Sequence, residues 1–256
     1  MKIKIADITL NLGIKDKLLK KAASERYKSF IAGSKPAYDI LIESKNYGIK
    51  LKHGTSFIHK KIYIYQKNYF GILDIVKKKG IAFIPNNIYY MDSFLRILYS
   101  TLLILNRGML IHGCGIRGGG ATLFSGVSSS GKTTIARYFN KKDVLSDEVV
   151  ALRKNSNGWY AYSTPFWGEM ESGRTRIKEK LNAVYMLKRG SLPKIEQLDV
   201  QQAFRRTFRN LLFFMKSGIG GDCINTVSDL CRQVPCYNFY FSPLRINRRI
   251  LDEIIK

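Results

Sequence analysis

The segment "SGVSSSGKTT", residues 125–134, constrains the fold more than any other part of the sequence. A glycine, four variable residues and Gly-Lys-Thr form the spacing in which backbone N–H groups wrap the phosphates of a nucleotide at the start of a helix. The apolar run "ATLF" before it has strand character, and Ile135, Tyr138 and Phe139 after it recur at helical spacing. We therefore expect a strand, a phosphate-binding loop and a helix, in this order.

Each position of this loop has an expected role. Glycines allow the close approach of backbone to phosphate, the Lys132 ammonium reaches the β- and γ-phosphates, and the Thr133 hydroxyl binds the Mg²⁺ that bridges them. ATP and Mg²⁺ are therefore the expected cofactors. A guanine-reading match, "NKKD" at 140–143, begins only eight residues after Lys132, so we interpret it as chance. The expected nucleotide contacts are Gly126, Val127, Ser128, Ser129, Ser130, Gly131, Lys132, Thr133 and Thr134.

Phosphoryl transfer also needs a metal ligand and a carboxylate that receives the acceptor's proton. Asp147 and Glu148 follow an apolar strand pattern, so one of them can hold Mg²⁺ while the other acts as the base. An ordinary acidic pair at a strand end is the alternative interpretation. His112 lies on the preceding strand candidate, where it either orients the base or contacts the γ-phosphate, unless it is a structural histidine.

The pattern of the whole chain predicts an α/β fold with a mixed sheet. The turn "RGGG", 117–120, predicts a hairpin that delivers the strand before the loop antiparallel to its predecessor. We expect a small N-terminal α+β module over 1–107 and a catalytic domain over 108–256. The expected strands include 2–10, 38–44, 61–66, 81–86, 109–116, 121–126, 143–154 and 181–190, and the expected helices are 15–33, 91–108 and 200–218. For the second helix, Asp92 or Ser93 is the expected N-terminal residue and Gly108 the stop.

The chain is strongly basic, with 43 Lys and Arg against 19 Asp and Glu, a formal net charge of +24. This charge predicts an acidic binding partner. The alternative is that the basic runs, which are scattered along the sequence, are solvent-exposed surface without a partner. No nucleic-acid-binding motif accompanies the charge, so an acidic protein or peptide is favoured over nucleic acid. We expect a cytoplasmic protein, because no signal peptide or transmembrane run is evident and the four cysteines have no metal-site spacing.

The motifs "IHGCGI", "GVSSSGKTT", "LSDEVV" and "TPFWGEM" occur in this order between residues 108 and 190. Together they resemble the HPr kinase/phosphorylase family and its relatives that phosphorylate ribosomally made peptides such as lasso peptides. The resemblance implies a P-loop kinase domain with the phosphoenolpyruvate carboxykinase type of fold, in which His112 lies at the active site. It further implies that Asp147 is the base and Glu148 a Mg²⁺ ligand. The segment "SGRTRIK" resembles the active-site segment, which makes Arg174 and Arg176 contacts for the acceptor or its phosphate.

The glycine- and isoleucine-rich signature of the bifunctional HPr enzymes is missing, so the resemblance does not extend to their phosphorylase activity or to HPr as the acceptor, and both are left open. The expected function is an ATP- and Mg²⁺-dependent kinase that phosphorylates a Ser or Thr hydroxyl on a protein or peptide. The main alternative is a P-loop kinase for a nucleic-acid end, a nucleoside or another small hydroxyl compound. A non-catalytic binding module and a carboxykinase are weaker alternatives, and assembly into a homo-oligomer is a further implication of the resemblance.

Overall fold

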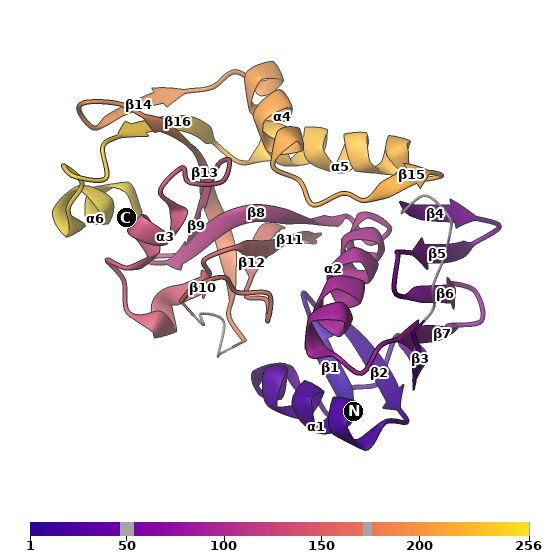
Figure 1. Cartoon of the computed structure of the whole chain (residues 1–256). Helices are drawn as coiled ribbons and strands as arrows, with labels where there is room; N and C mark the ends of the chain where they lie inside the picture. The colour runs from indigo at the N-terminus through magenta and orange to yellow at the C-terminus, as the bar shows by residue number, and fades with distance from the viewer. Residues whose placement is uncertain (47–53, 171–175, 256) are drawn as a thin grey trace. The chain divides into compact units, whose positions relative to one another are not determined.

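The computed structural model describes residues 1–46, 54–170 and 176–255 (Figure 1). Over these residues the chain is a mixed α/β protein with two mixed sheets and six α-helices. Two units are distinguished: Met1–Leu105 with Phe213–Gly221, and Asn106–Leu212 with Asp222–Lys256. None of the helices within the described ranges is both long enough and apolar enough to cross a membrane.

The first unit contains an eight-stranded sheet in the order β1-β2-β3-β7-β6-β5-β4-β15. β2, β3 and β7 pair in parallel, whereas β7, β6, β5 and β4 form an antiparallel meander. The sequence predicted a single strand over 2–10, but Ala6 and Asp7 adopt positive φ and turn it into a hairpin. The strands are β1 (Lys2–Ile5), β2 (Ile8–Ile14), β3 (Tyr38–Ser44), β4 (Gly54–Ile58), β5 (Lys61–Tyr65), β6 (Phe70–Asp74), β7 (Lys79–Ile84) and β15 (Met215–Ser217).

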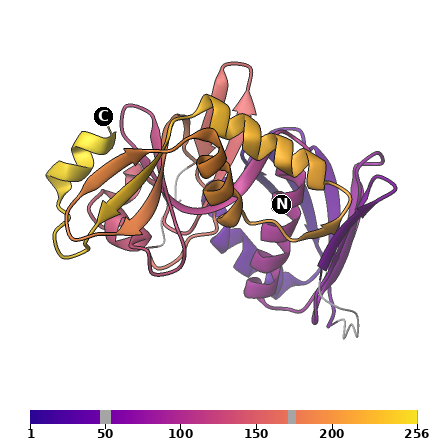
Figure 2. The same ribbon diagram turned by 90° about the horizontal axis from the view of Figure 1, so that it is seen from above.

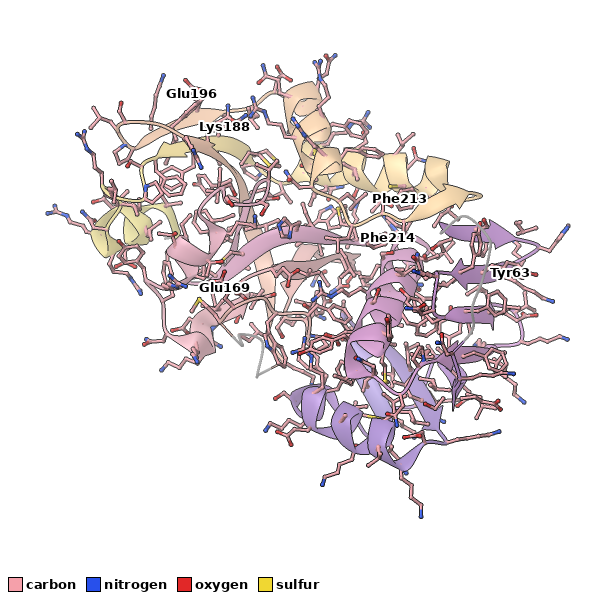
Figure 3. The ribbon with its side chains drawn as sticks, in the orientation of Figure 1. Tyr63, Glu169, Lys188, Glu196, Phe213 and Phe214 are labelled. Atoms are coloured by element: carbon pink, nitrogen blue, oxygen red, sulfur yellow. The ribbon has the colours of Figure 1, made fainter. Side chains whose placement is uncertain are left out.

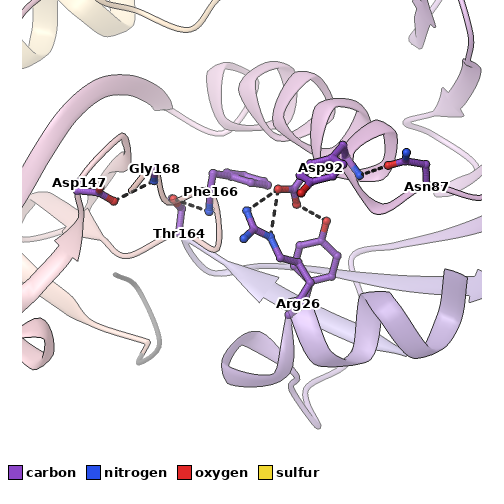
Figure 4. A network of polar contacts seen from close by, with 9 residues as sticks. Arg26, Asn87, Asp92, Asp147, Thr164, Phe166 and Gly168 are labelled. Atoms are coloured by element: carbon purple, nitrogen blue, oxygen red, sulfur yellow. Dashed lines mark hydrogen bonds and ion pairs between the residues drawn. The ribbon is translucent and has the colours of Figure 1, made fainter. Parts of the chain in front are cut away.

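Two helices belong to the first unit, α1 (Lys17–Arg26) and α2 (Ile88–Ile104). The predicted N-terminus of α2 was wrong, because the helix begins one turn earlier with Asn87 as its cap, whose side chain accepts the Tyr89 N–H. Asp92 is instead buried inside the helix, where it accepts hydrogen bonds from the guanidinium of Arg26 and the hydroxyl of Tyr27 (Figure 4). Asp92 cannot be the N-cap residue, because it lies within the helix Ile88–Ile104. Its carboxylate is instead buried in an ion pair with Arg26.

The second unit contains the other eight-stranded sheet, ordered β10-β8-β11-β12-β13-β16-β14, with β9 paired to both β8 and β13. The predicted hairpin is confirmed, because β9 runs antiparallel to β8 from Gly113↔Ser125 to Arg117↔Ala121. β9 is also parallel to β13, so the pairings β8-β9-β13-β12-β11-β8 close a ring. The strands are β8 (Gly108–Arg117), β9 (Ala121–Ser125), β10 (Val144–Ser146), β11 (Val149–Asn155), β12 (Gly158–Tyr162), β13 (Lys178–Arg189), β14 (Lys194–Gln197) and β16 (Cys236–Phe241).

The remaining helices are α3 (Lys132–Ala136), α4 (Val200–Arg209), α5 (Gly220–Gln233) and α6 (Arg248–Ile255) (Figure 2). α6 packs against the region of α3, because the Arg248 guanidinium lies 4.1 Å from the centre of the Phe139 ring and the Tyr138 hydroxyl donates to Ile246 O at 2.9 Å. The predicted helix over 200–218 was too long, since α4 ends at Arg209 and residues 215–217 form β15.

Candidate functional site

The glycine-rich loop, residues 126–131, joins β9 to α3 as the sequence predicts. Gly131 has φ of 100°, and a Cβ at this position would lie 2.6 Å from the Phe241 ring. A Cβ at Gly126 would lie 2.6 Å from the Ser130 hydroxyl oxygen. Real side chains do not tolerate such distances, so the shape of this loop depends on glycine at both positions.

Lys132 opens α3 and is 7% exposed. Its Nζ donates to the carbonyl oxygens of Gly126 at 2.9 Å and of Val127 at 2.8 Å, so the ammonium reaches back over the loop. Burial lowers the pKa of Lys132, and the nearby Cys114 and Glu148 oppose this shift. The protein therefore holds a partly desolvated cation at the loop, where an anionic ligand would gain most from it.

The Ser130 hydroxyl is buried and has no hydrogen-bond partner among the described residues. Leaving such a group unpaired costs ~1–3 kcal/mol, and native proteins seldom keep one without a reason. A phosphate oxygen is an acceptor of the kind that this hydroxyl lacks. The hydroxyl, the glycines and the Lys132 ammonium together fit the phosphates of a nucleotide.

Two carboxylates occupy the break between β10 and β11. The hydroxyl of Ser146 accepts the N–H groups of Glu148 and Val149, at 3.2 and 3.1 Å, which fixes the backbone at the break. Asp147 is 2% exposed, and one of its carboxylate oxygens accepts the N–H of Gly168 at 2.9 Å (Figure 4). The other oxygen accepts the N–H of Met170 at 3.1 Å. A second loop is thereby attached to this carboxylate.

His112 lies on β8 opposite Val149 of β11. Its Nδ1 is 3.0 Å from the backbone oxygen of Glu148. Because a carbonyl only accepts, Nδ1 carries the proton of this bond, and Nε2 is the acceptor in the neutral ring. The Ser125 hydroxyl donates to the His112 carbonyl at 2.8 Å and so joins the start of the glycine-rich loop to the same strand.

One cavity of about 440 Å³, the first cavity, brings these groups together. The sequence predicted eight of its charged and polar lining residues, namely His112, Ser128, Ser129, Lys132, Thr133, Thr134, Asp147 and Glu148. It did not predict the contribution of Arg137 and Glu169, which form an exposed ion pair of 3.0 Å. Glu169 is labelled in Figure 3. The complete lining is His112, Ser128, Ser129, Gly131, Lys132, Thr133, Thr134, Arg137, Asp147, Glu148, Gly168, Glu169 and Pro243.

Three of the predicted nucleotide contacts, Gly126, Val127 and Ser130, do not line this cavity in the described structure. Of the two arginines predicted to contact the acceptor or its phosphate, the structure describes one. Arg174 falls outside the described residues. Arg176 is exposed and is not among the described residues that line the first cavity. The sequence analysis also missed the backbone donors of Gly168 and Met170, although the glycine of "TPFWGEM" is a usable signal: a Cβ at Gly168 would lie 3.1 Å from Asp147 Oδ2.

The described residues contain no cluster of three or more His, Cys, Asp or Glu side chains able to hold a metal ion by themselves. Mg²⁺ in nucleotide sites takes one or two protein oxygens and completes its shell with phosphate oxygens and water. Thr133 and Glu148 line the same cavity and supply oxygens of this kind.

The site is thus defined by a glycine-rich loop, a buried lysine and a held carboxylate on three neighbouring segments of the second unit. No model of a known protein family matches the sequence, and a search of curated proteins also returned no match.

Proposed function

We propose that the protein is an ATP- and Mg²⁺-dependent kinase, of the HPr kinase-like P-loop type, that phosphorylates a Ser or Thr hydroxyl on a protein or peptide. The observation that carries this proposal is the first cavity, which is lined by Lys132, Thr133 and the Asp147 carboxylate together. A pure nucleotide binder needs the loop, the lysine and a metal ligand, but it needs no general base.

The residues divide the work of transfer between charge stabilisation and proton removal. Lys132 and the N–H groups of the glycine-rich loop bind the phosphates, while Thr133 and Glu148 hold Mg²⁺, which neutralises phosphate charge when bound. Asp147 accepts the proton as the acceptor oxygen bonds to the γ-phosphorus, and the bond from that phosphorus to the β–γ bridging oxygen breaks to release ADP. The N–H groups of Gly168 and Met170 hold the Asp147 carboxylate in place.

His112 acts in this scheme beside the carboxylates. Its bond to the Glu148 carbonyl fixes the ring and directs Nε2 as an acceptor in the neutral form. Nε2 is then suited to the acceptor hydroxyl, whereas the protonated ring would suit a phosphate oxygen.

The net charge of +24 favours a second candidate, a P-loop kinase for a nucleic-acid end, a nucleoside or another small hydroxyl compound. Both candidates use the same residues for the nucleotide. They differ only in the acceptor.

Asp147→Asn and Glu148→Gln test the proposed roles. Labelling of a Ser- and Thr-peptide library with radiolabelled ATP measures turnover, and calorimetry measures Mg·ATP affinity. We expect Asp147→Asn to lose ~10²- to 10⁴-fold in turnover, the usual value of a general base, while affinity changes little. Glu148→Gln should raise the Mg²⁺ concentration required for activity, because a ligand charge is lost.

Asp143→Asn is the matched control, since Asp143 pairs with Arg117 at 3.0 Å and does not line the first cavity in the described structure. It should leave turnover within about threefold of wild type. The same result for Asp147→Asn would exclude Asp147 as the base. Labelling of oligonucleotides or small alcohols but of no peptide would favour the second candidate.

A further inference from the structure

A second cavity, of about 310 Å³, lies along another part of the glycine-rich loop. Four of its lining residues are cations, Lys188, Arg189, Arg206 and Arg209, and its described lining contains no carboxylate. The first cavity is mixed in charge, with three acidic residues and the two cations Lys132 and Arg137 among its lining. The two cavities share Ser128 and Ser129 of the loop.

Two elements bring the four cations together. Lys188 and Arg189 end β13, and Arg206 and Arg209 lie in the last turn of α4. α4 is fixed at its start by Asp199, which accepts the Gln202 N–H at 2.8 Å. The cations therefore project from anchored elements and not from a solvated tail.

The positive charges of this cavity are not compensated. Within the described part of the chain none of the four forms an ion pair, whereas the neighbouring Lys194 is paired with Glu196 at 2.6 Å. Lys188 and Glu196 are labelled in Figure 3. Burial lowers the pKa of Lys188, and Arg206 and Arg209 lower it further. Like charges gathered without a partner cost free energy, which an anionic ligand would recover.

We infer that the second cavity binds carboxylate side chains of an acidic peptide acceptor, close in sequence to the hydroxyl that is phosphorylated. The inference rests on the proposed kinase function, because it assigns a place to that kinase's acceptor. Since Ser128 and Ser129 line both cavities, an extended peptide places its hydroxyl in the first cavity and a nearby Glu or Asp in the second.

Other anions fit this cavity less well. The Lys132 ammonium and the Thr133 hydroxyl, the side chains expected to bind the phosphates and their Mg²⁺, line the first cavity and not the second. Three other expected nucleotide contacts, Gly126, Val127 and Ser130, line the second cavity only, which makes the nucleotide the main competitor in the test below. Single-stranded nucleic acid is held largely by aromatic side chains on which bases stack, and the described lining of the second cavity has no aromatic residue. Arginine pairs with carboxylates, as it does with phosphates, in a two-bond geometry, so the arginines of this cavity can bind acidic side chains.

The test measures the binding of two fluorescently labelled peptides without nucleotide. One peptide has a Ser flanked by Glu residues, and the other has Gln in place of every Glu. We expect wild type to bind the Glu peptide at least about tenfold more tightly, because hydrogen bonds between charged groups are the strong ones. Arg206→Gln and Arg209→Gln should each remove most of this preference, and the affinity for Mg·ATP should not change.

Arg205→Gln is the matched control, because Arg205 is exposed on the same helix, carries the same charge and does not line the second cavity in the described structure. It should keep the preference within about threefold. An equal loss in Arg205→Gln would show a diffuse charge effect and overturn the inference.

Weaker Mg·ATP binding in Arg206→Gln would assign the cavity to the nucleotide, and tighter, Arg206-dependent binding of a labelled oligonucleotide would assign it to nucleic acid. Failure of every peptide to be labelled would sink the kinase proposal alone, because this test measures binding and not transfer.

Discussion

At the scale of single residues, Lys132 combines a proposed role in phosphate binding with a cost in folding stability. Its ammonium is buried enough to lower its pKa, so the folded protein holds a charge that water would solvate better. Two backbone carbonyls accept from it, which repays part of this cost. A buried ammonium at this position is best explained by an anionic ligand, which would stabilise the charge more than the two carbonyl oxygens do.

Replacing Lys132 with Met should therefore stabilise the fold while it abolishes phosphate binding. Below the folded-state pKa both states of the wild type carry the proton, so the advantage of Lys132→Met is constant there. Between the lowered pKa of Lys132 in the folded state and its ordinary value of ~10.4, the unfolded wild type binds more protons than the folded wild type. The stability of the wild type therefore rises with pH in this range, and the stability advantage of Lys132→Met shrinks. Urea unfolding of both proteins from pH ~7 to ~10.5 measures this.

A Met variant that is less stable than wild type at pH ~7 would contradict this prediction. It would mean that the bonds to Gly126 and Val127 outweigh the cost of burying the charge. Lys142→Met serves as the control for the loss of an exposed lysine, because such a surface substitution should change the free energy of unfolding by no more than ~0.5 kcal/mol.

The residues of the site differ in how well sequence predicts them. The loop spacing and Lys132 follow from local geometry, because all the groups involved lie within a few positions of one another. The hydrogen bonds from Gly168 and Met170 to Asp147 join residues more than twenty positions apart, and no rule of sequence spacing predicts them. The second cavity was equally hidden: the run Arg205–Arg209 was evident, but its meeting with Lys188 depends on where α4 packs.

At the scale of elements, α2 shows how a tertiary contact overrides a capping pattern. Asp92 looked like a cap, yet it is 7% exposed and pairs with Arg26 at 2.6 Å. Burial raises the pKa of Tyr27 well above its ordinary value, and the Asp92 charge adds to this. The pair joins α1 to α2 within the first unit.

Asp92→Ala should cost far more stability than Asn87→Ala. Loss of the cap leaves one exposed N–H to water and costs ~1 kcal/mol. Loss of Asp92 leaves the Arg26 charge and the Tyr27 hydroxyl without their acceptor, which costs ~3–5 kcal/mol for a buried pair. Urea unfolding followed by circular dichroism measures both, and equal costs would show that the pair is effectively solvated.

The elements themselves were predicted where their pattern was local. The hairpin of β8 and β9 followed from its glycine turn, and β3 matched its expected range. The helix over 200–218 was predicted too long because its apolar and basic pattern continues past Arg209. There the chain leaves to pair β15 with β4, a partner more than 150 residues earlier, which a local pattern cannot reveal.

At the scale of the whole molecule, both units carry an excess of basic residues, but the two cavities at the glycine-rich loop differ in charge. Basic residues exceed acidic ones in both units. Around the glycine-rich loop, however, the acidic residues gather at the first cavity and unpaired cations at the second. In the kinase that we propose, this separation would let one loop serve a metal-bound phosphate on one part and an acidic acceptor on another.

The overall charge of +24 should make the folded protein less stable at low ionic strength. Self-repulsion acts over the Debye length, which falls from ~30 Å at 0.01 M to ~8 Å at 0.15 M salt, so added NaCl should raise the free energy of unfolding. Lys20→Glu with Lys21→Glu changes two exposed lysines of α1 and should weaken this salt dependence, while Lys20→Arg with Lys21→Arg should preserve it. Urea unfolding at both salt concentrations, followed by circular dichroism, provides the measurement. A wild-type stability that stays constant or falls as NaCl is added would mean that the basic residues are already neutralised by local contacts, and the unpaired cations of the second cavity would then need another explanation.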